Sequence, residues 1–109
     1  MSDQNSFCRR IMFNRTWDLL SSRWKVYLIY LLAAGPVRFG ALRRQCPAVS
    51  RVTFTTYLRQ LEREGLVFRT PMPEETHAVE YSLSERGRRV LPAVTALIEW
   101  GFAEEGDEA

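Results

Sequence analysis

Arginine and threonine side chains recur within residues 51–63 at spacings that place them on one side of a helix. The apolar Phe54, Leu58 and Leu61 mark the side that faces a core, so the polar side faces outward. Arginine can form two hydrogen bonds with guanine, and threonine can bond a base edge or contact the thymine methyl group. Threonine also has low helix propensity, which favours a binding role for this face over a merely solvated one. The pattern predicts DNA base contacts from Arg51, Val52, Thr53, Thr55, Thr56 and Arg59.

Further polar residues near this helix are candidates for phosphate contacts, which fix register without reading sequence. A short stretch before the helix contains three arginines and would cross the sugar–phosphate backbone in a helix-turn-helix. Ser50 can cap the longer helix and also offer its backbone N–H to a phosphate, although capping alone would explain it. For Arg38, the alternative is a partner within the chain, such as Glu62 or Glu64. The residues expected at phosphates are Arg38, Arg43, Arg44, Ser50 and Arg63.

The net charge of +2 over 109 residues conceals an uneven distribution. Residues 1–73 contain 12 Lys and Arg against 4 Asp and Glu, whereas residues 74–109 contain 3 against 9. All but one of the 15 cations are arginine. A basic front half favours a polyanionic partner such as double-stranded DNA, with solvated helix faces as the alternative.

The chemistry available to the other side chains is limited. Two cysteines and one histidine are too few for a disulfide framework or a structural zinc site, so no metal is expected. Cys8 is a candidate redox switch, because Arg9 and Arg10 beside it favour the reactive thiolate; packing in a dimer helix is the alternative. Cys46 is expected to pack. No carboxylate–histidine set, phosphate-binding loop or nucleophile motif is present, so we expect neither an enzyme nor a bound cofactor.

Length and hydropathy indicate one domain. Residues 1–109 are expected to form a single unit, with a polar, flexible leader at 1–6 and a frayed acidic tail at 104–109. No apolar run approaches the roughly 18 residues that cross a bilayer. The polar start also lacks a signal-peptide core. We therefore expect a cytoplasmic protein without a membrane partner.

Periodicity predicts the elements that position these side chains. Apolar spacings of three and four over residues 17–31 predict an amphipathic helix, which a Gly-Pro pair ends. Residues 38–44 predict a short helix, and residues 51–64 a longer one capped by Ser50. Two such helices separated by a turn at 46–49 are typical of a helix-turn-helix.

After the helix expected over residues 51–64, apolar residues recur at every second position. Residues 66–70 and 78–83 read as strands, and the polar loop between them makes the hairpin a wing. Ser84 caps a last helix, which Pro92 should kink, and residues 90–102 carry more apolar surface than one core-facing side requires. The predicted fold is α+β, mainly α: a winged helix-turn-helix. Its wing residues are Pro73, Glu74, Glu75, Thr76 and His77.

Several short motifs follow one another in a specific order. The strongest motif is Gly35-Pro36-Val37-Arg38-Phe39-Gly40-Ala41-Leu42-Arg43-Arg44. It is followed by Val49-Ser50 with Phe54, Leu58, Leu61 and Glu62, and then by Gly65-Leu66-Val67. The remaining motifs are Val79-Glu80-Tyr81-Ser82-Leu83-Ser84-Glu85, Trp24 and Trp100-Gly101. Over about residues 17–101 the chain resembles the HxlR-type family of winged helix-turn-helix regulators, with the family's G-P-x-R-F-x-x-L-R and V-E-Y-S-L signatures.

This resemblance implies a transcription regulator that binds an inverted-repeat operator as a homodimer. The dimer would use extra N- and C-terminal helices, in agreement with the apolar surplus of residues 90–102, and it would present its recognition helices to successive major grooves. The resemblance also implies a response to oxidants, electrophiles or small molecules. The expected interface residues are Phe7, Ile11, Val94, Leu97, Ile98 and Trp100.

Three features differ from the family pattern, and two alternatives stay open. The family usually carries P-P-x before V-E-Y, whereas Thr76-His77-Ala78 precede Val79 here. Cys8 lies 16 positions before Trp24, further than the family's usual cysteine, and the acidic Glu74 and Glu75 would repel phosphate at the wing. Trp24, with Trp17 and Tyr27, forms either core or a small effector pocket. The alternative function is a winged helix that contacts only proteins, which would lack the steep salt dependence of phosphate contacts.

Overall fold

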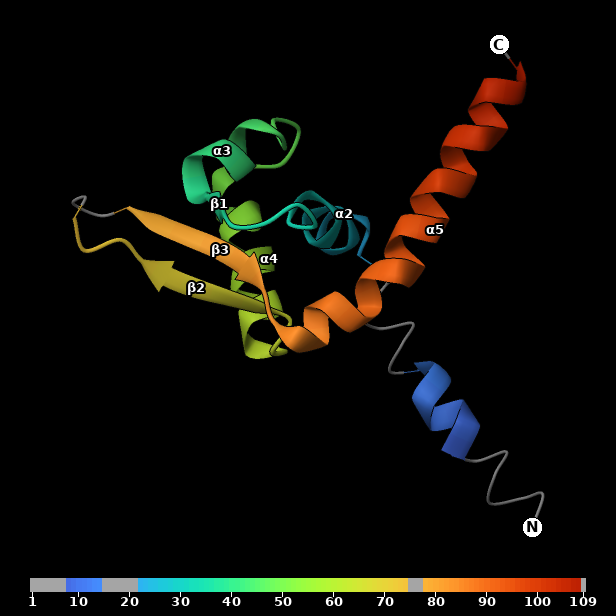
Figure 1. Cartoon of the computed structure of the whole chain (residues 1–109), viewed down its shortest axis with the longest axis horizontal. Helices are drawn as coiled ribbons and strands as arrows, with labels where there is room; N and C mark the ends of the chain where they lie inside the picture. Colours follow the sequence, from blue (N-terminus) through green and yellow to red (C-terminus); the bar gives the residue numbers. More distant parts are fainter. Residues whose placement is uncertain (1–7, 15–21, 75–77, 109) are drawn as a thin grey trace.

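The computed structural model describes residues 8–14, 22–74 and 78–108. Residues 8–14 are helical, and the elements that follow are α2 (Arg23–Leu31), β1 (Val37–Arg38), α3 (Phe39–Arg44), α4 (Arg51–Arg63), β2 (Val67–Pro71), β3 (Val79–Leu83) and α5 (Glu85–Glu108). Figure 1 shows α2, α3 and α4 gathered against a small sheet, with α5 starting at the end of β3, passing α2 and then leading away from the other elements. This arrangement confirms the α+β, mainly α, winged helix-turn-helix.

Serine side chains begin three of the helices. Ser50 Oγ accepts a hydrogen bond from the backbone N–H of Thr53 at 3.2 Å, and Ser84 Oγ accepts one from Gly87 at 3.0 Å, as the sequence predicts. Ser22 caps α2 in the same way through Lys25. The helix expected over residues 17–31 is thus described from residue 23 onward, and residues 17–21 lie outside the described part of the chain.

The sheet has three antiparallel strands in the order β1-β3-β2. Strands β2 and β3 form the predicted wing hairpin, with Val67 opposite Leu83 and Arg69 opposite Tyr81. Strand β1 was not anticipated: its two residues pair with Tyr81 and Glu80. Arg38 therefore belongs to β1 and precedes α3 instead of starting it, because two residues are too few to show a strand period and only the pairing partner defines the strand.

The core lies where α2, α4 and the inner side of the sheet meet. The predicted stripe of α4 is confirmed, since Phe54, Leu58 and Leu61 are buried. Cys46 is also fully buried in this cluster, in agreement with a packing role. The remaining core residues are Leu28, Ile29, Leu32, Leu42, Val49, Leu66, Val67, Tyr81, Leu83 and Val94.

A close approach of backbones fixes α5 against the base of the wing. A Cβ atom at Gly87 would lie 2.2 Å from the carbonyl oxygen of Leu66, so only glycine fits there. Gly65, which ends α4, has φ +76°, in the left-handed region that favours glycine. Ser84 Oγ donates to the Gly65 carbonyl at 2.6 Å and completes the junction.

One ion pair joins α2 to the end of α4. The Nζ atom of Lys25, a residue that is only 6% exposed, lies 2.5 Å from Glu64 Oε1. Arg86 of α5 donates to the Glu64 backbone carbonyl at 2.8 Å, so the same residue is held from two elements. Glu64 was one of the two partners considered for Arg38, and the structure shows that its carboxylate pairs with Lys25.

Helix α5 is long and changes direction after its first turns, in the segment that contains Pro92 (Figure 1). This bend matches the expected kink, because proline removes one backbone hydrogen bond and crowds the preceding turn. The helix is assigned to Glu108, so most of the tail for which fraying is expected, residues 104–109, belongs to α5, and residue 109 lies outside the described residues. No helix in the described ranges is long and apolar enough to cross a membrane.

Candidate nucleic-acid interface

The outward side of α4 carries the residues predicted to read bases. Val52 is 78% exposed, and Thr56 and Arg59 are exposed as well, whereas Thr55 is half-buried at the edge of a groove. Arg51 and Thr53 lie in the first turn of the helix and are also exposed. The structure therefore places all six predicted readout residues on α4 and leaves at least part of each accessible.

Hydrogen bonds within the first turns of α4 restrict two of its threonines. Ser50 Oγ lies 3.0 Å from Thr53 Oγ1, and Thr56 Oγ1 donates to the Val52 carbonyl at 2.9 Å. The hydrogen of the Thr56 hydroxyl is therefore engaged within the helix. Its oxygen remains able to accept a hydrogen bond, and its methyl group can make an apolar contact.

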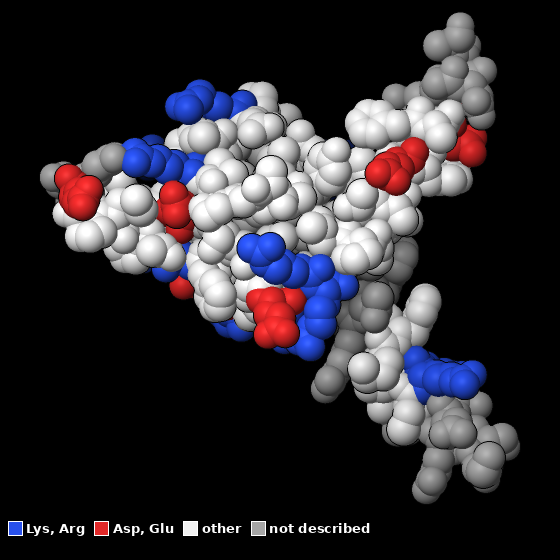
Figure 2. All heavy atoms as spheres, in the orientation of Figure 1, with Lys and Arg blue, Asp and Glu red and all other residues white. Residues whose placement is uncertain are grey.

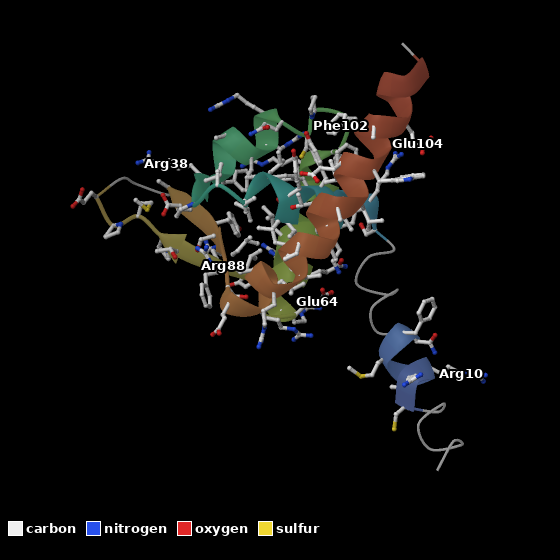
Figure 3. The ribbon with its side chains drawn as sticks, turned by 45° about the vertical axis from the view of Figure 1, so that its right-hand side comes forward. Arg10, Arg38, Glu64, Arg88, Phe102 and Glu104 are labelled. Atoms are coloured by element: carbon white, nitrogen blue, oxygen red, sulfur yellow. The ribbon has the colours of Figure 1, made fainter. Side chains whose placement is uncertain are left out.

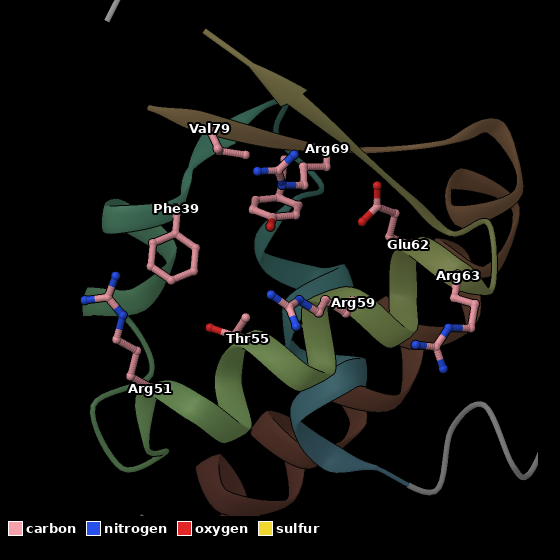
Figure 4. Close-up of a pocket in the computed structure, with 9 residues that line it drawn as sticks. Phe39, Arg51, Thr55, Arg59, Glu62, Arg63, Arg69 and Val79 are labelled. Atoms are coloured by element: carbon pink, nitrogen blue, oxygen red, sulfur yellow. The ribbon is translucent and has the colours of Figure 1, made fainter. Parts of the chain in front are cut away.

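A groove of about 700 Å³ separates α4 from the sheet, and four arginines line it. Arg51, Arg59 and Arg63 come from α4, and Arg69 comes from β2. We call this hollow the arginine groove; Phe39, Thr55, Glu62, Val79 and Tyr81 complete its lining. Figure 4 shows the side chains of Thr55 and Arg59 pointing from α4 into the arginine groove and that of Arg69 pointing into it from the sheet. Phe39 and Glu62 lie toward opposite ends of the arginine groove.

The charge of the arginine groove is mostly uncompensated. None of its four arginines forms a salt bridge within the described part of the chain. Arg51 lies 5.6 Å from the centre of the Phe39 ring, a cation–π distance that leaves its hydrogen-bond donors available. Glu62 is the one carboxylate in the lining. A groove of this kind attracts a polyanion.

Arg69 is a candidate contact that sequence reasoning missed. It follows the exposed Phe68 in β2, and alternation along the strand puts it on the same side as the buried Val67. It hydrogen-bonds the side chain of Tyr81, opposite it in the sheet. Burial raises the pKa of the Tyr81 phenol, and Arg69 offsets only part of this rise, so Tyr81 remains neutral in the groove. Side chains alternate between the two sides of a strand, so the position of Arg69 two residues after Val67 was the sequence signal that could have placed it on the side facing α4.

The residues predicted to contact phosphate have different surroundings. Arg43 donates from Nη1 to the Cys46 carbonyl at 2.7 Å and lies 5.7 Å from the centre of the Phe54 ring, so it also supports the turn of the motif. Arg44 is exposed and lines a second hollow, of about 500 Å³, together with Arg38. Arg63 and Ser50 are exposed at the two ends of α4. Figure 2 shows basic side chains over α3 and beside the sheet.

The wing ends in an acidic turn. Pro73 and Glu74 form the described part of this turn, and Glu75, Thr76 and His77 lie outside the described residues. The backbone N–H of Met72 donates to the Ala78 carbonyl at 2.9 Å and extends the hairpin beyond its strands. Figure 2 shows acidic atoms at the tip of the hairpin, where they would face phosphate if the wing approached DNA.

The two cysteines differ in their environment. Cys8 is a free, exposed thiol in the helix of residues 8–14, and Cys46 is free and buried. Burial raises the pKa of the Cys46 thiol, although Arg43 nearby lowers it in part. The described residues contain no cluster of histidine, cysteine or carboxylate side chains that could hold a metal ion.

The residues predicted for a dimer interface fall into three groups. Ile11, Leu97 and Trp100 expose 40%, 55% and 66% of their surface, so they are available to a partner. Val94 has no exposed surface and belongs to the core of its own chain, which corrects its assignment to the interface, and Ile98 packs partly against that core. Phe7 lies outside the described residues. Met12, Phe13 and Phe102 are further exposed apolar residues that this prediction omitted.

Most of the large exposed apolar residues lie on the two terminal helices, and Val52 on α4 and Phe68 on β2 are exposed as well. Figures 1 and 3 both draw the helix that carries Arg10 well away from the sheet and from α3 and α4. Leu97 and Phe102, which are both exposed, lie on different sides of α5, as expected for a helix whose outer part leaves the body of the fold.

A helix-turn-helix followed by a two-stranded wing, with a basic groove beside its second helix, defines the winged-helix class of DNA-binding proteins. The sequence profile of the HxlR-like helix-turn-helix family matches residues 19–108. The chain belongs to this family of transcriptional regulators.

Similar proteins share most of the length of the chain. An HTH-type transcriptional regulator of Halalkalibacterium halodurans is 38% identical over 96 residues, which are 87% of this chain and 85% of that protein. Among solved structures, the redox regulator HypR in its oxidized form is 37% identical with a TM-score of 0.78, covering 84% of this chain and 94% of that one. Quinone-bound YodB from B. subtilis is 25% identical with a TM-score of 0.71, covering 84% and 96%.

Proposed function

We propose that this chain is a sequence-specific DNA-binding regulator that acts as a homodimer on an inverted-repeat operator. One observation carries the proposal: the exposed Val52, Thr56 and Arg59 on α4 stand beside the arginine groove. The helix would enter the major groove, and its side chains would read base edges. The surrounding arginines would bind the phosphates on either side.

Selection of bound sequences from a random pool of double-stranded DNA tests this proposal. An enriched inverted repeat, with half-site centres roughly one helical turn of 10–10.5 base pairs apart, is the expected result. The affinity for the selected site should also fall steeply with salt, since each phosphate contact releases about one counterion. No enriched motif at low salt would favour the alternative, a winged helix that contacts only proteins.

The dimer part of the proposal rests on the exposed apolar residues of the terminal helices. Leu97 and Trp100 on α5, with Ile11 on the helix of residues 8–14, form apolar surface that a single chain leaves in water. Large exposed apolar patches on a small protein mark interaction sites. An inverted repeat requires two recognition helices. A second copy of the chain is the partner that would supply the second one.

We further propose that oxidation of Cys8 changes DNA affinity. Cys8 is exposed, whereas burial and the raised pKa of Cys46 disfavour reaction of that second thiol. HypR, a structural neighbour, is a redox regulator, and another, YodB, is found with a bound quinone.

Treatment with hydrogen peroxide, followed by measurement of DNA affinity, tests the role of Cys8. The Cys8→Ser variant should bind DNA as the untreated protein does and lose the response to peroxide. The Cys46→Ser variant is the matched control and should keep the response. An equal response in wild type and Cys8→Ser would remove Cys8 from the mechanism.

A further inference from the structure

An aromatic hollow lies on the side of α4 away from the arginine groove. It consists of two adjoining spaces of about 470 Å³ and 520 Å³, which share Arg23 and Trp24 in their linings. Its other walls are Tyr27 and Gln45 in one space and Ser22 and Tyr57 in the other. Each space has a volume in the range of about 300–1,000 Å³ that is common for small-molecule sites, and both are shallow and open to solvent.

The walls of the aromatic hollow combine flat rings with polar groups. The Trp24 and Tyr27 rings meet edge to face, with their centres 6.1 Å apart, and both residues are half-buried. Arg23 lies over the Trp24 ring at 5.5 Å from its centre. This contact holds the guanidinium at the rim, where its donors can form two hydrogen bonds with a carboxylate.

The polar groups at the rim are not engaged within the described part of the chain. Arg23 forms no salt bridge there, and the Gln45 side chain has no hydrogen-bond partner. Two donors beside an aromatic wall match a planar aromatic ring that carries one negative charge. An aliphatic anion would lose the ring contacts, and a neutral aromatic molecule would lose the charge-assisted hydrogen bonds.

The aromatic hollow touches three helices: α2, α3 and α4, the second helix of the helix-turn-helix. Arg23, Trp24 and Tyr27 belong to α2, Gln45 ends α3, and Tyr57 lies on α4. Tyr57 and Thr55 are two residues apart, so they point about 200° apart around α4. A molecule in the aromatic hollow would therefore leave the arginine groove open while contacting both helices of the motif.

We propose that the aromatic hollow is an effector site for planar aromatic carboxylates of one or two rings. Its occupant bridges α2 to α3 and α4, so it fits one arrangement of these helices better than others. The effect of this ligand on DNA binding rests on the function proposed above. A ligand shifts DNA affinity only when it binds one arrangement of the helices more tightly than another. By linkage, DNA changes ligand affinity by the same factor.

Calorimetric titration of the full chain with 1-naphthoate tests the site directly. One molecule per chain should bind, and both 1-naphthamide, which lacks the charge, and cyclohexanecarboxylate, which lacks the rings, should bind at least about tenfold more weakly. Arg23→Gln should weaken naphthoate by about tenfold or more, and Arg89→Gln, on an exposed arginine of α5, should not. Equal binding of naphthoate by Arg23→Gln and wild type overturns the proposal.

Two further measurements separate the site from its alternatives. Naphthoate should change the affinity for the selected DNA site in wild type and leave it unchanged in Arg23→Gln. If DNA binds but naphthoate does not, the effector site is wrong and the proposed function stands; if naphthoate binds but no DNA sequence is selected, the proposed function fails and the site stands. If Arg23→Gln instead changes the oligomeric state, the aromatic hollow is a contact between copies, and the effector proposal is overturned.

Discussion

At the scale of single residues, the side chains of α4 are unequal candidates for reading bases. The Thr56 hydroxyl donates to the Val52 carbonyl, so toward DNA it offers only an acceptor and a methyl group. Arg59 is exposed, forms no salt bridge within the described residues and lines the arginine groove. Of these two side chains, only Arg59 has donors free for a guanine edge.

Replacing Arg59 by alanine tests this difference. The affinity for the selected site should fall by about 1–3 kcal/mol, and the preference at one base position should relax. Competition binding against a panel of single-base variants of the site measures both effects. Arg89→Ala on α5 is the control for loss of one exposed arginine. An unchanged sequence preference in Arg59→Ala would show that this side chain does not read a base.

Arg43 and Arg44 provide a second contrast between neighbouring arginines. Arg43 supports the turn of the motif through the Cys46 carbonyl and the Phe54 ring, whereas Arg44 is exposed. If both contact phosphate, alanine at either position should lower the salt slope of DNA binding by about one.

Stability measurements separate the two positions further. Arg43→Ala should in addition lower the free energy of unfolding by about 1 kcal/mol, because it removes a partly buried hydrogen bond. Urea unfolding of both variants, beside a salt titration of DNA binding, checks this. A slope equal to that of wild type would exclude a phosphate contact by the arginine concerned.

At the scale of elements, the recognition helix is held at both ends. Ser50 caps its start, and Lys25 and Arg86 engage Glu64 at its end. The junction of Gly65, Ser84 and Gly87 then joins α5 to the base of the wing. These contacts connect α5, which carries the proposed dimer surface, to the helix that would enter DNA.

Two glycines of α5 give opposite predictions for the same substitution. Gly87→Ala would place a Cβ 2.2 Å from the Leu66 carbonyl oxygen and should lower the free energy of unfolding by about 1–3 kcal/mol. Gly101→Ala meets nothing within 4 Å and should raise it by up to about 1 kcal/mol, because alanine favours the helix. Thermal unfolding of both variants provides the comparison. A neutral Gly87→Ala would mean that α5 and the wing base can separate at little cost.

At the scale of the whole molecule, the exposed apolar surface of α5 should determine the oligomeric state. The double variant Leu97→Ser, Trp100→Ser should be monomeric, since each side chain contributes about 2 kcal/mol when buried against a partner. Size-exclusion chromatography with light scattering measures the change. Phe68→Ser, which replaces an apolar residue equally exposed on the wing, should remain dimeric. A monomeric wild type, or a double variant that stays dimeric, would contradict the proposed interface.

The sequence predicted most of the local structure, because local signals determine it. The Ser50 and Ser84 caps, the stripe of Phe54, Leu58 and Leu61, and the two wing strands each depend on residues a few positions apart. Strand β1 and Arg69 were missed for the same physical reason. Both depend on pairing with β3, whose residues are more than ten positions away along the chain.

The sequence by itself thus determined the helix-turn-helix, the wing and the outward side of α4. The tertiary structure decided which of these side chains share a site. It brought Arg69 to the arginines of α4, placed Val94 in the core instead of at an interface, and gathered Arg23, Gln45 and Tyr57 around one hollow. Periodicity shows which side of an element is apolar, but only the packing of that element against its neighbours determines what the side meets.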